Sequence, residues 1–224
     1  MKTLEITRPN SKELLKYTNF AVALESTTKV VNILIDSADL QTLKDAHYML
    51  CFAKKVGDTY NVVWQAYAEY LGNNEFSWTP QYQLFGTNTF KDAVTVKGST
   101  NIVSIGLGEQ STLNTAGVLS APVSGGSDIA INMVNNYGNI HPGVNQLSYG
   151  VDGSQVSTPI YVAEDVMVSG TAELVPVEQV MVWFQQNIST STMFSTVRSN
   201  AVEIDLTTTN EESRLYKGGK WSKV

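Results

Sequence analysis

Hydrophobic and polar residues alternate in short runs along most of this chain, which is the pattern of half-buried β-strands. The first clear run covers residues 28–36, where Val31, Ile33 and Ile35 fall on one face. Similar runs recur from residue 81 onward, separated by glycine, asparagine, serine and proline residues. Short alternating strands at such spacing predict a mainly β protein of the sandwich or barrel type.

One segment follows a helical pattern instead. Residues 37–47 predict a short helix, because Asp36 or Ser37 can cap its start and Leu40 and Leu43 make an apolar side. A shorter helical turn is expected at residues 11–17.

A β-hairpin is expected directly after the helix. Residues 48–56 and 59–65 alternate in polarity on either side of Gly57-Asp58. Two alternating runs joined by a glycine-bearing pair of residues are typical of a hairpin with a tight turn.

Segments about a hundred residues apart resemble each other. Residues 99–107 match residues 198–206, and residues 111–120 match residues 213–222. Such self-similarity indicates a repeated structural unit. The matching positions in the first pair of segments are Asn101, Val103, Ile105 and Leu107 with Asn200, Val202, Ile204 and Leu206.

We therefore expect two related antiparallel β-sandwich units, residues 1–122 and 123–224, that arose by internal duplication. The small, flexible residues at 121–127 are the expected linker. The two units could pack side by side or form one sandwich with a pseudo-two-fold axis, and the sequence leaves both arrangements open.

Charge and cysteine content argue against several classes of function. The net charge is −6, and the 15 basic residues are scattered, which argues against nucleic-acid binding and against simple adhesion to anionic lipid. Cys51 is the only cysteine and lies in an apolar run, so we expect a buried thiol and no disulfide. No secretory signal or membrane span is recognisable, and a cytoplasmic location is expected.

The sequence offers no catalytic or cofactor motif. His47 and His141 lie far apart, and neither has the carboxylate or histidine spacing of a metal site. His47 is expected to end the helix. We therefore assign no catalytic residue, no metal ligand and no cofactor.

Two groups of residues are candidate ligand contacts. Aromatic rings in or beside a loop suit sugar stacking or headgroup contact, and the first group is Tyr67, Tyr70 and Trp78. A loop dense in amides suits a polyhydroxylated ligand, and the second group is Asn135, Asn136, Tyr137, Asn139, His141 and Asn145. Each group has a structural alternative, namely a loop held by its own aromatics and a turn network that satisfies its own backbone.

These features favour a non-catalytic recognition protein that binds a carbohydrate or a lipid headgroup, with a role in defence. One alternative is a membrane-active pore-forming toxin, in which residues 88–121 would rearrange at the membrane. Another is a carboxylate- or metal-dependent enzyme with its site between the two units. Contact with a membrane and assembly into a homo-oligomer are compatible with each of these functions.

Overall fold

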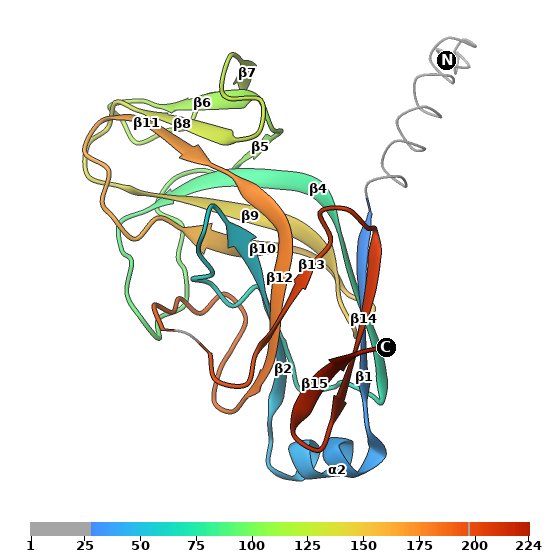
Figure 1. Ribbon diagram of the computed structural model, residues 1–224. Helices are drawn as coiled ribbons and strands as arrows, with labels where there is room; N and C mark the ends of the chain where they lie inside the picture. The colour runs from blue at the N-terminus through green and yellow to red at the C-terminus, as the bar shows by residue number, and fades with distance from the viewer. Residues whose placement is uncertain (1–27, 197) are drawn as a thin grey trace, which may run out of the picture.

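The computed structural model describes residues 28–196 and 198–224, and these form a mainly β protein with a single helix (Figure 1). The helical turn expected at residues 11–17 lies outside the described residues. The strands belong to three sheets that pack in a sandwich-like arrangement.

The largest sheet has seven strands. In chain order they are β1 (Lys29–Ile35), β4 (Asn73–Thr87), β5 (Val103–Ile105), β9 (His141–Tyr149), β10 (Gln155–Val162), β14 (Glu211–Lys217) and β15 (Lys220–Lys223). Their order across the sheet is β10-β9-β4-β1-β14-β15, and β5 pairs with β4.

The other two sheets have four strands each. The second sheet contains β2 (Met49–Val56), β3 (Gln65–Tyr67), β12 (Pro176–Gln185) and β13 (Val202–Asp205), in the order β13-β12-β2-β3. The third contains β6 (Glu109–Leu113), β7 (Val123–Ser124), β8 (Ile131–Asn135) and β11 (Gly170–Leu174), in the order β11-β8-β6-β7.

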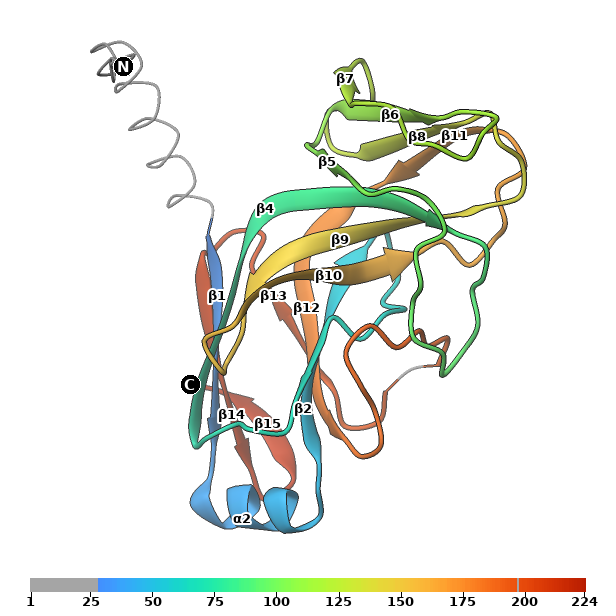
Figure 2. The same ribbon diagram turned by 180° about the vertical axis from the view of Figure 1, so that it is seen from behind.

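All three sheets contribute to one main hydrophobic core. Leu84 and Val144 come from the largest sheet, Phe52 and Val182 from the second, and Met133 from the third, and all are fully buried. The third sheet lies at the opposite end of the molecule from the helix (Figure 2). Alternating burial gives β1 one apolar face for this core, whereas β2 and β9 are buried on both faces over most of their length.

The helix α2 (Ser37–Asp45) confirms the prediction for residues 37–47. The Asp36 side chain accepts a hydrogen bond from the Ala38 backbone amide at 3.1 Å, which satisfies one of the free amides of the first turn. Leu43 is the buried residue on its apolar side. His47 follows the helix in a left-handed backbone conformation.

The predicted hairpin is present with a different second strand. Val56 and Thr59 form a bridge around the Gly57-Asp58 turn, but the regular partner of β2 is β3, which lies further along the chain. Asn61 and Val63 leave the ladder because they bond elsewhere: the Asn61 side-chain amide donates to the Val162 carbonyl at 2.7 Å, and the Val63 backbone amide donates to the Thr192 carbonyl at 2.8 Å.

The strand pairing of the first half of the chain recurs in the second half. The strands correspond in order: β1 to β8, β2 to β9, β3 to β10, β5 to β13, β6 to β14 and β7 to β15. The long strand β4 corresponds to β11 followed by β12. Every pairing among the strands of the described residues then has a counterpart. The two parallel pairs, β1 with β14 and β6 with β8, are counterparts of each other.

The correspondence extends to individual residues. Tyr82 on β4 pairs with Ile105 on one side and Gln146 on the other, as Val180 on β12 pairs with Ile204 and Lys54. Ile105 and Ile204 are both buried within strands. This repetition is a property of the fold, and the internal duplication of the sequence stays a prediction.

Each sheet contains strands from both halves of the chain, so the two halves do not form separate sheets. β4 of residues 1–122 pairs with β9 of residues 123–224, and β2 pairs with β12. The expected linker at 121–127 contains β7, which pairs with β6. The boundary between residues 122 and 123 therefore does not coincide with a boundary between sheets.

Candidate functional site

The three aromatic residues expected at a ligand site lie in the core. Tyr67, Tyr70 and Trp78 are 6%, 0% and 1% exposed, so their ring faces are covered by other side chains. The Tyr70 hydroxyl donates to the Tyr48 carbonyl at 3.0 Å. In this structure the three rings stabilise the interior, and they do not form the exposed aromatic surface that sugar stacking requires.

Asn135 organises the amide-rich loop from a buried position. Its amide nitrogen donates to the carbonyls of Gly138 and Met167 at 2.7 and 3.2 Å, and its amide oxygen accepts from the Tyr137 backbone amide at 2.9 Å. Because the nitrogen and the oxygen of this side-chain amide both form hydrogen bonds with the backbone of the loop, Asn135 has a structural role.

The rest of the loop is more open. Asn136, Tyr137 and Asn139 are exposed, and the Tyr137 ring lies beside Gly117. His141 is half-buried, with Nδ1 2.9 Å from the Ala163 carbonyl oxygen. The structure therefore brings three of the expected residues to one surface, without gathering the six into one cavity.

Asn145 lies apart from the loop, in the middle of β9, and is only 6% exposed. Its amide nitrogen donates to the side-chain oxygen of Gln83 at 3.3 Å, and the Ser157 hydroxyl donates to the same oxygen at 2.9 Å. The amide oxygen of Asn145 has no hydrogen-bond partner within the structure. A buried acceptor of this kind calls for a donor from water or a ligand.

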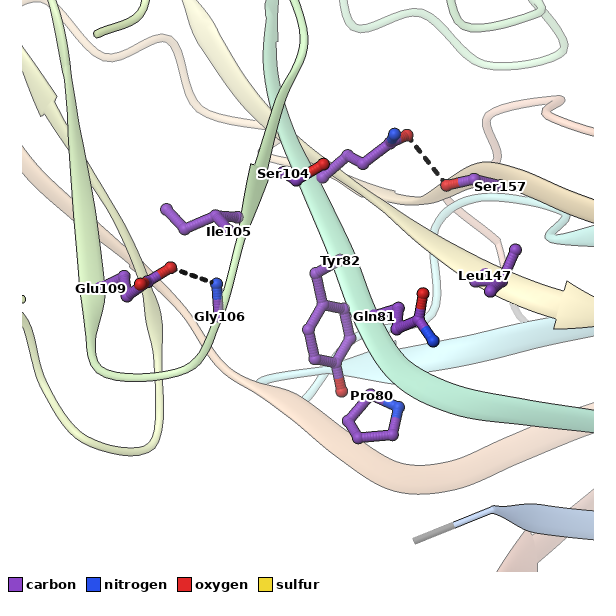
Figure 3. Close-up of a pocket in the computed structure, with 10 residues that line it drawn as sticks. Pro80, Gln81, Tyr82, Ser104, Ile105, Gly106, Glu109, Leu147 and Ser157 are labelled. Atoms are coloured by element: carbon purple, nitrogen blue, oxygen red, sulfur yellow. Dashed lines mark hydrogen bonds between the residues drawn. The ribbon is translucent and has the colours of Figure 1, made fainter. Parts of the chain in front are cut away.

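A groove of about 390 Å³ lies beside this polar network (Figure 3), and we call it the sheet groove. Strand β4 forms its floor, the chain from β5 to the start of β6 forms one wall, and single residues of β9 and β10 complete it. Its lining residues are Pro80, Gln81, Tyr82, Gln83, Ser104, Ile105, Gly106, Glu109, Leu147 and Ser157.

The sheet groove combines uncharged hydrogen-bonding groups with small apolar surfaces. Gln81 and Ser104 are exposed, and Leu147 is half-buried. Burial raises the pKa of the Tyr82 hydroxyl, which therefore remains neutral. Such a lining can exchange hydrogen bonds with a neutral polar ligand.

Glu109 is the one charged residue among those that line the groove. Its carboxylate accepts a hydrogen bond from the Gly106 backbone amide at 2.7 Å, as Figure 3 shows. The sequence has no lysine or arginine between Lys97 and Arg198. The groove therefore lacks the cation that a phosphate or carboxylate ligand would require.

The groove does not present a pair of carboxylates that could divide acid and base roles, because Glu109 has no second carboxylate beside it in the lining. Within residues 28–196 and 198–224, no cluster of three or more histidine, cysteine, aspartate or glutamate side chains could hold a metal ion.

Sequence reasoning missed the groove residues Gln81 and Gln83. Both fall at the start of the alternating runs that recur from residue 81 onward, and they alternate with the buried Tyr82 and Leu84. The alternation placed these amides on an outward face, but the sequence did not indicate that β9 and β10 would lie beside them.

No family model, curated protein or solved structure matches this chain. In the described part of the chain, no helix has the length and apolar character needed to cross a membrane.

Proposed function

We propose that this protein is a non-catalytic recognition protein that binds a neutral, hydroxyl-rich ligand of the carbohydrate class in the sheet groove. The observation that carries the proposal is the pair Gln83 and Ser157 in the groove lining, hydrogen-bonded to each other and backed by Asn145, which donates to Gln83 and whose own amide oxygen lacks a donor. Sugar hydroxyls both donate and accept hydrogen bonds, and they match amide and hydroxyl side chains in both roles.

A carbohydrate fits the groove better than a lipid headgroup does. Phosphate groups are bound in proteins by lysine, arginine or helix N-termini, whereas the charged group in this lining is the carboxylate of Glu109. Leu147 and Pro80 offer apolar surface to the C–H face of a sugar ring. Hence we favour a neutral glycan.

A glycan-array screen of the purified protein tests the proposal. For a glycan that binds, we expect Gln83→Leu to weaken the affinity about tenfold or more, because it removes the shared acceptor and leaves the Asn145 amide without its partner. Gln110→Leu, on strand β6 and outside the groove lining, is the matched control and should bind as the wild type does.

Two results would contradict the proposal. The wild type could bind no glycan on the array, or the affinity could be the same in the Gln83→Leu and Gln110→Leu variants. Release of dye from loaded vesicles by the same preparation would instead favour the alternative of a membrane-active toxin.

The proposal includes a cytoplasmic location, which is supported by the single cysteine, a buried free thiol. It is also compatible with a homo-oligomer, and sedimentation of the wild-type protein measures that directly.

A further inference from the structure

A second cavity, of about 370 Å³, lies between helix α2 and the hairpin formed by β14 and β15. We call it the helix–hairpin cleft. Its lining residues are Asp39, Thr42, Leu43, Tyr48, Phe184, Ser199, Asn200, Tyr216 and Gly219. It shares no residue with the sheet groove.

Aromatic rings form much of the wall of this cleft. The rings of Phe184 and Tyr216 are 4.8 Å apart between centroids and meet edge to face. Phe184 also stacks with Trp221, with centroids 5.6 Å apart and planes inclined by 4°. Tyr48 also lines the cleft and, like Phe184, is only partly buried. The mutual packing holds these rings in place before a ligand arrives.

Asp39 is the one charged residue in the cleft lining. Its carboxylate accepts a hydrogen bond from the Gly218 backbone amide at 2.7 Å, which ties the turn of the hairpin to the helix. The cleft therefore places a carboxylate, held by its own hydrogen bond, beside aromatic rings.

Two nearby lysine ammonium groups have other partners. Lys217 lies 3.2 Å from a carboxylate oxygen of Asp36. Lys44 lies 3.9 Å from a carboxylate oxygen of Glu69 and 5.3 Å from the centre of the Tyr70 ring. Neither lysine lines the cleft.

The corresponding place in the other half of the fold is filled. Under the strand correspondence Gly86 takes the place of Phe184, and a Cβ atom at Gly86 would come within 2.8 Å of the Ile140 side chain. The loop at residues 136–140 also replaces the helix there. The cleft is therefore formed by α2 and the aromatic residues, and it is not a feature of the strand arrangement that the two halves share.

We propose that the helix–hairpin cleft binds an organic ammonium ion. A cation is attracted to the negative face of aromatic rings, and a carboxylate at the same place adds a direct charge interaction. Amines and quaternary ammonium groups with apolar substituents also gain from contact with the rings, whereas a strongly hydrated metal cation does not. This site is separate from the carbohydrate groove and does not depend on it.

Titration with tetramethylammonium chloride, followed by ligand-observed NMR, tests the proposal. We expect saturable binding that sodium chloride at equal ionic strength does not reproduce. The Asp39→Asn variant should bind about tenfold more weakly, because it removes the charge while an amide oxygen can still accept from Gly218. Asp45→Asn, on the same helix but outside the cleft lining, is the matched control and should leave binding unchanged.

Neopentyl alcohol, an uncharged molecule of similar shape, separates a cation site from an apolar one and should bind much more weakly than tetramethylammonium. Phe184→Leu provides a second variant and should weaken binding of the cation, with the thermal unfolding transition of each variant as the check on folding. Equal binding of the alcohol, an unchanged affinity in both Asp39→Asn and Phe184→Leu, or no binding at all would overturn the proposal.

The ammonium group could belong to a small soluble molecule or to a phosphatidylcholine headgroup. Co-sedimentation with phosphatidylcholine vesicles, but not with phosphatidylglycerol vesicles, would assign the lipid source. Binding of tetramethylammonium without co-sedimentation would assign a soluble one. A Gln83→Leu variant should bind tetramethylammonium as the wild type does, so that failure of the carbohydrate proposal and failure of this one are distinguishable.

Discussion

The ammonium group of Lys54 lies 2.7 Å from a carboxylate oxygen of Glu178, although the Lys54 side chain is fully buried. The indole nitrogen of Trp78 donates to the same oxygen at 2.8 Å, and the Lys54 ammonium lies 4.6 Å from the centre of the Trp78 ring. The pair joins β2 to β12, two adjacent strands from different halves of the chain. A buried charge requires such a partner, because its desolvation is otherwise uncompensated.

Removal of the Glu178 charge should therefore destabilise the fold. We expect Glu178→Gln to lower the free energy of unfolding by about 2–4 kcal/mol, because the buried Lys54 ammonium loses its counter-charge. Denaturation with urea measures the change. Lys55→Met is the matched control: this neighbouring lysine is only partly buried and bonds the neutral Gln179 side chain, so it should change the stability by less than about 1 kcal/mol. Equal losses in the two variants would contradict the role given to the pair.

Lys54 should also make stability depend on pH. Burial lowers the pKa of Lys54 to about 8 in the folded protein, against 10.5 for a free lysine. Between these values Lys54 binds its proton in the unfolded chain but not in the folded one, so the contribution of this residue to stability should rise with pH. Between pH 8 and pH 10 we expect the wild type to gain about 1–2 kcal/mol in the free energy of unfolding relative to a Lys54→Met variant, with both proteins measured by urea denaturation.

Cys51 and several tyrosines oppose this contribution from about pH 9 upward, in the wild type and the variant alike, because burial raises their pKa values. Burial raises the pKa of Tyr70 to about 12, so the folded state retains a proton that the unfolded state releases at pH 10 and above. Burial also raises the pKa values of Tyr67 and Tyr82. The same pH dependence in the wild type and in the Lys54→Met variant would contradict the assignment to Lys54.

The Cys51 thiol should be unreactive in the native protein. It is fully buried, so a reagent cannot reach it. Burial also raises its pKa to about 12, so the thiol is not ionised at pH 8. We expect Ellman's reagent to label it about a hundredfold more slowly in buffer than in urea. Rapid labelling under native conditions would show that β2 opens easily or that the thiol is accessible.

Gly143 should not tolerate a side chain. A Cβ atom there would lie 2.3 Å from the Phe85 ring, so Gly143→Ala should force β9 away from β4 or displace the ring. We expect a loss of about 1–3 kcal/mol in the free energy of unfolding. Gly98→Ala is the matched control, since its Cβ would meet the same ring at an ordinary 3.8 Å. A comparison of the two melting temperatures checks this.

The elements that were predicted correctly depend on neighbours along the chain. The strand β1 buries Val31, Ile33 and Ile35, as the alternation in the sequence indicated. Helix α2 begins after the expected cap Asp36. Alternation and capping involve residues within a few positions of one another, so they can be recognised in the sequence without knowledge of the fold.

The aromatic candidates are buried for a reason that the local sequence does not contain. The sequence around Tyr67, Tyr70 and Trp78 marks a cluster of large rings near one loop, but it does not say which strands cover that cluster. Trp78 is enclosed because Lys54 and Glu178, distant in sequence, come to lie against it. Exposure depends on contacts between distant segments, and a local pattern does not contain them.

The amino-acid sequence alone indicates that this chain is mainly β, where most strands and the helix after Asp36 lie, and that Cys51 is buried. Which strands pair and where cavities form depends on the tertiary structure. Gln83, for instance, meets Asn145 and Ser157 across separations of 62 and 74 residues. Hydrophobic burial selects such long-range pairings for the whole chain at once, whereas the spacing of polar and apolar residues reports only the local backbone.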